Sequence, residues 1–371
     1  MFFSSQTDNI IAALEQNNRV RKVDLWDLEG WQLEQVLTAM RAPLPQLAVL
    51  RLISGGETVP VIPDSFLDGS APRLRYFSLD GIPFPGLPSL LLSATHLVSL
   101  WLESIPHSGY FSPEPMVSLL SILSSLEELS LQFESPRSCP DGETRAPPPS
   151  ERSVIPALHH FCFKGVVEYL EDLVTDIDIP KLDHTRITFF NSIDFNTPRL
   201  ARFINRTPKL GKRDATVLFS DGSAAVELSG SLQIEISCLE PDWQLSSIEQ
   251  VCNSFWDSLS TVEYLYIDHR YRQLVWKDDA IENILWLQLL LPFTAVKYLY
   301  LSKEFAPGIA TTLQELDGDR ITEVLPSLRS IYVEWLEPSG PVQEGIGQFI
   351  AARQLSDHTI TVSHWNISRR G

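Results

Sequence analysis

Residues 97–102 read Leu-Val-Ser-Leu-Trp-Leu, and the spacing Leu-x-x-Leu-x-Leu decides the fold because it returns along the chain. Eight clear copies begin at Leu47, Leu74, Leu97, Leu126, Leu158, Val262, Val296 and Leu328. In a short strand, alternating apolar residues point to one face, so the last two apolar positions of each copy should enter a core. The first apolar position should pack the approach to the strand, and the residues between the last two should face the other side.

The repeat length indicates the fold class. With weaker copies at Val20, Leu182 and Leu210, the first positions are mostly 23 to 34 residues apart. Periods of roughly 20 to 29 residues with this pattern are typical of leucine-rich repeats, which become stable only when neighbours stack. We expect an α/β fold, a leucine-rich-repeat solenoid of irregular repeats with a curved parallel sheet on the concave side and helices on the convex side. The interval from Leu210 to Val262 is about twice as long as the others, and we expect it to contain one degenerate repeat at Leu232–Ile236.

The domain organisation follows from the repeats. A repeat array grows in one dimension, so residues 1–371 are predicted to form a single leucine-rich-repeat solenoid. Residues 133–153 are rich in Pro, Ser and charge, which predicts a disordered loop insertion between two repeats. Residues 341–371 contain a helical pattern followed by the strand-like Thr-Ile-Thr-Val-Ser-His-Trp, and these should form a C-terminal cap.

Composition restricts the partners and the compartment. The net charge of −18 disfavours nucleic acid, whose phosphates need clustered Lys and Arg, and favours a basic protein partner. There is no run of eighteen apolar residues and no basic start followed by an apolar stretch, so we expect no membrane span and a cytoplasmic or nuclear location. The four cysteines are widely spaced, as is usual in a reducing compartment, and Cys252 should be a core residue.

Sequence patterns for catalysis or metal binding are missing. The phosphate-binding loop, the dinucleotide fingerprint, the nucleophile elbow and the zinc-protease motif do not occur. His159 and His160 are adjacent in an expected strand, where they would point to opposite faces and could not easily share an ion. We therefore expect a non-catalytic protein with no cofactor and no metal.

The residues most suited to partner binding are aromatic. Between the last two apolar positions of the late repeats stand Tyr266, Tyr300 and Tyr332, and Tyr264 and Tyr298 form a parallel column. The same position in earlier repeats is mixed and includes Arg51 and Trp101, which offer a second candidate patch. Two readings of the tyrosines stay open. They form either a cross-strand ladder that stabilises the sheet or a recognition surface.

Two stretches of sequence carry a resemblance to a known family. They are Ala-Pro-Arg-Leu-Arg-Tyr-Phe-Ser-Leu-Asp-Gly-Ile-Pro-Phe at Ala71–Phe84 and Ser-Ala-Thr-His-Leu-Val-Ser-Leu-Trp-Leu-Glu-Ser-Ile-Pro at Ser93–Pro106. The sequence resembles the leucine-rich-repeat region of fungal, mushroom-type F-box proteins over nearly its whole length. The resemblance implies the substrate-recognition part of a cullin-type ubiquitin-ligase receptor, in which repeats hold the target and an F-box docks on a Skp-type adaptor.

The chain departs from that family at its start. About nineteen residues precede Val20, and they do not match the F-box module, which has roughly forty residues. A Skp-type adaptor is therefore expected as a partner only if an F-box exists upstream. The leading hypothesis is a protein-interaction module of an F-box-type receptor, and the alternative is a leucine-rich-repeat scaffold or regulator unrelated to ubiquitin transfer.

Overall fold

The structure is a computed structural model of the chain. It describes residues 4–56, 59–63, 65–84, 90–136, 152–190, 195–210, 213–239, 241–269, 280–316, 318, 320–337, 339–354 and 359–365. The chain divides into two compact units, unit 1 at Met1–Thr185 and unit 2 at Arg186–Gly371, which are described separately below. That residues 1–371 form a single solenoid stays a prediction.

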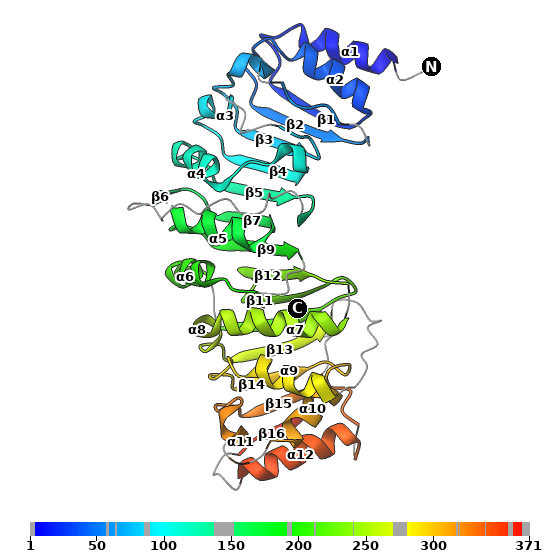
Figure 1. Ribbon diagram of the computed structural model, residues 1–371, viewed down its shortest axis with the longest axis vertical. Coiled ribbons are helices and arrows are strands. Elements are labelled where there is room, and N and C mark those ends of the chain that lie inside the picture. Colours follow the sequence, from blue (N-terminus) through cyan, green and yellow to red (C-terminus); the bar gives the residue numbers. More distant parts are fainter. Residues whose placement is uncertain are drawn as a thin grey trace. The chain divides into compact units, whose positions relative to one another are not determined.

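Unit 1 alternates strands with helices (Figure 1). Its elements are α1 (Ser4–Leu14), β1 (Lys22–Leu28), α2 (Gly30–Ala39), β2 (Val49–Ser54), the 3-10 helix η1 (Phe66–Gly69), β3 (Tyr76–Asp80), α3 (Leu90–Ser93), β4 (Ser99–Ile105), η2 (His107–Gly109), α4 (Pro113–Ile122), β5 (Glu128–Phe133), β6 (Ser153–Val154), β7 (His160–Gly165), α5 (Val167–Asp176) and β8 (Ile177–Asp178). Strands β1, β2, β3, β4, β5 and β7 form a parallel sheet in chain order, and β6 pairs with β8 in a small separate sheet.

Burial in the sheet of unit 1 follows the repeated spacing. In the copy from Leu97, all three skeleton leucines are fully buried. Leu100 and Leu102 lie in β4 in register with Phe77 and Leu79 of β3, so equivalent positions stack from strand to strand. Helix α1 packs on α2, α3 on α4 and α4 on α5, and the helices form a second layer beside the sheet (Figure 1). The predicted register of these repeats is confirmed, and the opposite face of the sheet carries the intervening residues.

Unit 2 contains the remaining elements (Figure 1). They are β9 (His184–Phe190), which begins at the division between the units, α6 (Pro198–Arg206), β10 (Asp214–Phe219), β11 (Ser223–Leu228), β12 (Leu232–Ser237), α7 (Pro241–Ser254), α8 (Trp256–Leu259), β13 (Tyr264–His269), α9 (Ala280–Leu290), β14 (Tyr298–Leu301), α10 (Ala306–Gln314), α11 (Arg320–Glu323), β15 (Ser330–Glu334), α12 (Pro341–Gln354) and β16 (Thr361–Trp365). Its strand order is β9-β12-β11-β10-β13-β14-β15-β16.

The strand of the degenerate repeat predicted at Leu232–Ile236 is present, but it belongs to a meander and not to a separate strand-and-helix repeat. These residues form β12, which runs antiparallel to β11, and β11 runs antiparallel to β10. The chain therefore makes a three-stranded meander before it resumes parallel pairing from β10 to β13. The meander accounts for the long interval from Leu210 to Val262, because antiparallel strands need only short turns and no crossover helix.

The predicted register of the copy at Leu210 is wrong, by two residues. Ala215 pairs with Leu265 and Val217 with Ile267, so Ala215 and Val217 occupy the last two apolar positions. Leu210 is buried before the strand begins. By contrast, the weak copy at Leu182 is in the predicted register, because the amides of Asp183 and His184 both donate to the carbonyl of His159, as in the stronger repeats.

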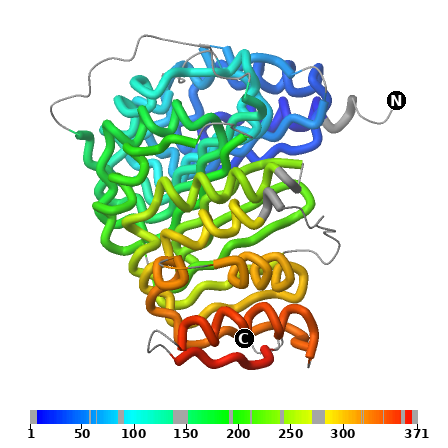
Figure 2. The backbone as a smooth tube through the Cα atoms, turned by 60° about the horizontal axis from the view of Figure 1, so that its bottom comes forward, coloured from blue at the N-terminus to red at the C-terminus, as the bar shows by residue number. Residues whose placement is uncertain are grey.

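The end of unit 2 is built from a helix layer and the last strands of the sheet. Helix α7 packs on α9, α9 on α10 and α10 on α12, and Figure 2 shows these helices following one another toward the red end of the chain. The last strand, β16, pairs in parallel with β15 and is the final strand of the order. The predicted helix and edge strand within residues 341–371 thus correspond to α12 and β16.

A buried arginine joins α12 to the preceding turn. The guanidinium of Arg353 is almost fully buried and donates to the carbonyls of Val324 and Leu325. Leu325 has a φ of 50°, in the left-handed region that non-glycine residues seldom adopt. The arginine therefore stabilises a strained turn that the apolar pattern does not reveal.

The predicted loop insertion at residues 133–153 falls mostly on residues 137–151, which lie outside the described residues. At its two ends, Phe133 is the last residue of β5 and Ser153 the first of β6. Phe133 is fully buried in an aromatic cluster with Phe111, Phe163 and Tyr169. This core residue therefore bounds the segment on its N-terminal side.

Candidate functional site

The face of the unit 2 sheet that carries the tyrosines is opposite to its leucine face. In β13, Leu265 and Ile267 are fully buried, and Tyr264 and Tyr266 alternate with them and are partly exposed. Strands β14 and β15 repeat this alternation in register, because Tyr266 pairs with Tyr300 and Tyr300 with Tyr332. All five predicted tyrosines therefore lie together on one face, which we call the tyrosine face.

The rings of the tyrosine face stack across the strands. The ring centroids of Tyr266 and Tyr300 are 4.4 Å apart at an interplanar angle of 16°, and those of Tyr300 and Tyr332 are 4.6 Å apart at 8°. In the second column, Tyr264 and Tyr298 stack at 4.8 Å. The stacking explains how exposed aromatic side chains are held in fixed orientations, because parallel strands bring equivalent residues to roughly 5 Å spacing.

Trp365 belongs to the same face and was missed in the sequence. Its ring lies 5.4 Å from Tyr300 in an edge-on arrangement and 6.2 Å from Tyr266. Trp365 pairs in register with Glu334, so its indole reaches diagonally over the tyrosine column. The signal in the sequence is an aromatic residue at an outward position of the last strand. Alternation assigns such a residue to a face but does not show its diagonal reach.

Burial and neighbouring phenols change the chemistry of the central ring. Burial, together with the four neighbouring tyrosines, raises the pKa of Tyr300 to about 12. The hydroxyl therefore stays protonated at neutral pH and can donate or accept a hydrogen bond. The tyrosine face thus offers stacked aromatic area with neutral polar tips, which suits protein recognition.

A charged border runs along the start of the strands. The Lys297 Nζ atom lies 2.6 Å from Glu263 Oε1, and this hydrogen bond is the main cause of the lowered pKa of Glu263. Arg213 lies 3.7 Å from Glu263 and also stacks its guanidinium over the ring of Tyr264, 5.3 Å from the centroid. The apolar spacing does not single out these residues, because Glu263 and Lys297 stand directly before Tyr264 and Tyr298, and Arg213 directly before β10, at positions where the pattern requires no apolar residue.

The other two predicted residues lie in unit 1 and are not in the tyrosine face. Arg51 pairs in register with Ser78, and Ser78 with Trp101, so one strand separates Arg51 from Trp101. The indole of Trp101 lies 6.3 Å from the ring of Tyr76 and donates to Glu128 at 3.3 Å. Nearby, burial raises the pKa of Glu103, which also accepts hydrogen bonds from Ser130 and Gln132. This second patch is polar and mixed in charge.

Titratable residues gather at the other end of the unit 2 strands. The Nδ1 atom of His269 lies 3.3 Å from Asp268, and its Nε2 atom lies 3.5 Å from Glu304. Among the described residues, no group of three His, Cys, Asp or Glu side chains has an arrangement that could hold a metal ion. Within the same part of the chain, no helix is long and apolar enough to cross a membrane.

Neither a protein-family model nor a curated protein sequence matches this chain. Among solved structures, the chain is similar to the crystal structure of the leucine-rich repeat-containing protein LegL7 from Legionella pneumophila. The TM-score is 0.33 at 11% sequence identity, and the alignment covers 92% of this chain and 94% of that chain.

Proposed function

We propose that the chain is a non-catalytic protein-recognition module of the leucine-rich-repeat type and that the tyrosine face of unit 2 holds its partner. The observation that carries the proposal is the stacked row of Tyr266, Tyr300 and Tyr332, whose side chains are partly exposed and alternate with the buried apolar residues of their strands. Rigid aromatic side chains bind partners at low entropic cost, and tyrosine is enriched among residues that dominate binding energy.

The charge of the chain supports a basic partner. The net charge is −18, and cations are attracted to aromatic faces. Arg213 already stacks on Tyr264 within the chain, which illustrates the contact that a partner arginine would make with a ring of the tyrosine face. The proposed partner is therefore a protein segment with arginine or lysine near its anchoring residues.

A more specific role, as the substrate-recognition part of an F-box-type ubiquitin-ligase receptor, is supported only by the sequence resemblance. The alternative is a scaffold or regulator outside ubiquitin transfer. A pull-down with purified Skp-type adaptor tests whether the chain itself contains a docking element for the adaptor. The chain as printed should not bind the adaptor by itself, whereas direct stoichiometric binding would reveal a docking element and strengthen the ligase role.

Affinity purification of the intact chain followed by mass spectrometry tests the proposed function. A partner that is recovered with the native chain should be lost with a Tyr266→Ala/Tyr300→Ala variant. The contrary result, equal recovery by both, would place recognition elsewhere, and Arg51 and Trp101 would be the next residues to vary.

A further inference from the structure

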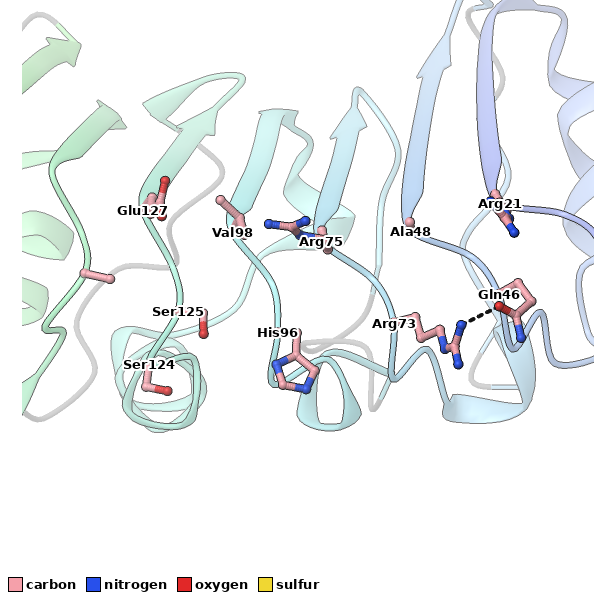
Figure 3. Close-up of a pocket in the computed structure, with 11 residues that line it drawn as sticks. Arg21, Gln46, Ala48, Arg73, Arg75, His96, Val98, Ser124, Ser125 and Glu127 are labelled. Atoms are coloured by element: carbon pink, nitrogen blue, oxygen red, sulfur yellow. Dashed lines mark hydrogen bonds between the residues drawn. The ribbon is translucent and has the colours of Figure 1, made fainter.

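An open groove of about 940 Å³ follows the edge of the unit 1 sheet at which the strands begin (Figure 3). Its lining includes Arg21, Arg73 and Arg75, with His96 beside them and Glu127 farther along. The groove thus contains three arginines and one glutamate in a chain whose net charge is −18. This local reversal of charge is independent of the tyrosine face and lies in the other unit.

The backbone fixes where the arginine side chains start. The carbonyl of Arg21 accepts the amides of Ala48 and Val49, and the carbonyl of Ala48 accepts those of Arg75 and Tyr76. Arg21, Ala48 and Arg75 are therefore equivalent residues of successive repeats, each directly before its strand. Neighbouring strands are about 4.8 Å apart, so Arg21 and Arg75 start roughly 10 Å from each other.

The three guanidiniums are exposed and have no acidic partner in the described part of the chain. Arg73 donates to the side-chain oxygen of Gln46 at 2.6 Å, which is a neutral acceptor. No ion pair between described residues involves Arg21, Arg73 or Arg75. Their charges are available to an anion, and guanidinium suits carboxylate and phosphate because it forms paired hydrogen bonds.

We propose that this groove binds an extended acidic peptide segment, with its carboxylate or phosphoryl groups on Arg21, Arg73 and Arg75. From β1 to β7 the groove crosses five strand spacings, about 24 Å, which an extended peptide spans with about seven residues. The arginine end covers roughly 10 Å of this length, or about three residues. The acidic residues of the ligand therefore occupy one half only.

The other half of the groove favours neutral residues. It is lined by Val98, Ala157 and the hydroxyls of Ser124 and Ser125, and the carboxylate of Glu127 repels a further acidic side chain. A peptide is a better fit than a long polyanion. A nucleic acid would extend beyond the arginines over a chain of net charge −18, where repulsion opposes binding.

Fluorescence anisotropy with the intact chain tests the proposal. The probes are labelled seven-residue peptides that carry three glutamates, three phosphoserines or three glutamines in one half, and a single-stranded RNA. Arg75→Gln should weaken binding of an acidic peptide roughly two- to fivefold, and the triple variant of Arg21, Arg73 and Arg75 more than tenfold. Binding should weaken as salt rises.

Two further variants make the test specific. Arg75→Glu should lose the acidic peptide and gain affinity for a lysine-containing peptide, whereas Arg320→Gln, at an exposed arginine of unit 2, should change nothing. Glu127→Gln should strengthen binding of a peptide that is acidic throughout.

Preference for the glutamate or the phosphoserine peptide identifies the anionic group within the proposal. Equal binding of the glutamine peptide, an equal loss with Arg320→Gln, or binding of RNA alone would overturn it. Variants of the tyrosine face leave this binding unchanged, so failure here and failure of the proposed function are distinguishable.

Discussion

The indole of Trp365 lies edge-on to the ring of Tyr300, with ring centroids 5.4 Å apart and an interplanar angle of 68°. Tyr300 is also stacked on both sides, by Tyr266 and by Tyr332. It is therefore the centre of the tyrosine face, and Trp365 connects the last strand to that centre. This arrangement has consequences for stability that can be separated from binding.

Stability should fall in proportion to the number of ring contacts that a substitution removes. Each aromatic pair contributes about 0.5–1.5 kcal/mol beyond area burial. Tyr300→Ala removes contacts with three rings and should lower the free energy of unfolding by about 2–3 kcal/mol, whereas Tyr332→Ala, which loses one stack, should cost about 1 kcal/mol. Urea denaturation measures both. Equal losses would show that the stack contributes little, and Tyr300→Phe, which keeps the ring, is the control.

Stability should also depend on pH through Tyr300. Its pKa is raised to about 12 by burial, whereas a tyrosine in an unfolded chain ionises near 10. Between about pH 10 and 12 the folded chain holds a proton that the unfolded chain has released, so stability falls as pH rises through this window. Below about pH 10 both states are protonated and the effect vanishes. The midpoint temperature of thermal unfolding should fall more steeply with pH for the native chain than for Tyr300→Phe. Parallel curves would contradict the assignment.

Gly165 of β7 should not tolerate a larger residue. A Cβ atom there would lie 2.6 Å from the ring of Phe163 and 3.0 Å from that of Phe133. Gly165→Ala should destabilise unit 1 by about 1–3 kcal/mol, because overpacking displaces the aromatic cluster. Gly347→Ala in α12 is the matched control, because nothing lies within 4 Å of its Cβ position. It should raise stability by about 0.5–1 kcal/mol, and a loss there would point to a general effect of the substitution.

The cysteines should differ in their reaction with iodoacetamide. Cys252 is fully buried, and burial, reinforced by the charge of Glu249, raises the pKa of its thiol, so it should stay unmodified in the folded chain. Cys162 is only partly buried on the open face of β7 and should react. Peptide mapping after brief alkylation measures both. Modification of Cys252 as fast as Cys162 would contradict the expected core position.

The spacing predicted the register correctly in the eight clear copies and in the weak copy at Leu182. The register failed at β10, because the small Ala215 replaces a leucine there and the buried Leu210 lies before the strand. The reversed direction of β11 could not be read, since alternation is the same in parallel and antiparallel strands. The apolar face of a strand is thus predictable, whereas its partner is decided by distant packing.

The same limit holds for the candidate sites, where the sequence predicts the face on which a side chain lies but not its neighbours from other strands. Alternation placed Tyr266, Tyr300 and Tyr332 on one face, and the register in the structure stacks them. The contact of Trp365 with Tyr300 depends on the pairing of β16 with β15, for which the spacing gave no information. The three arginines of the groove became visible as a group only when the hydrogen bonds showed that Arg21 and Arg75 are equivalent.

The central claim is that the tyrosine face binds a protein, and quantitative co-purification tests it most directly. The intact chain, the Tyr266→Ala/Tyr300→Ala variant and Trp101→Ala are compared at a temperature well below their unfolding transitions. The account predicts that a partner recovered by the native chain and by Trp101→Ala is depleted at least about tenfold with the double variant. Full recovery by the double variant, with only its thermal stability lowered, would show that the tyrosines are a structural ladder and would contradict the claim.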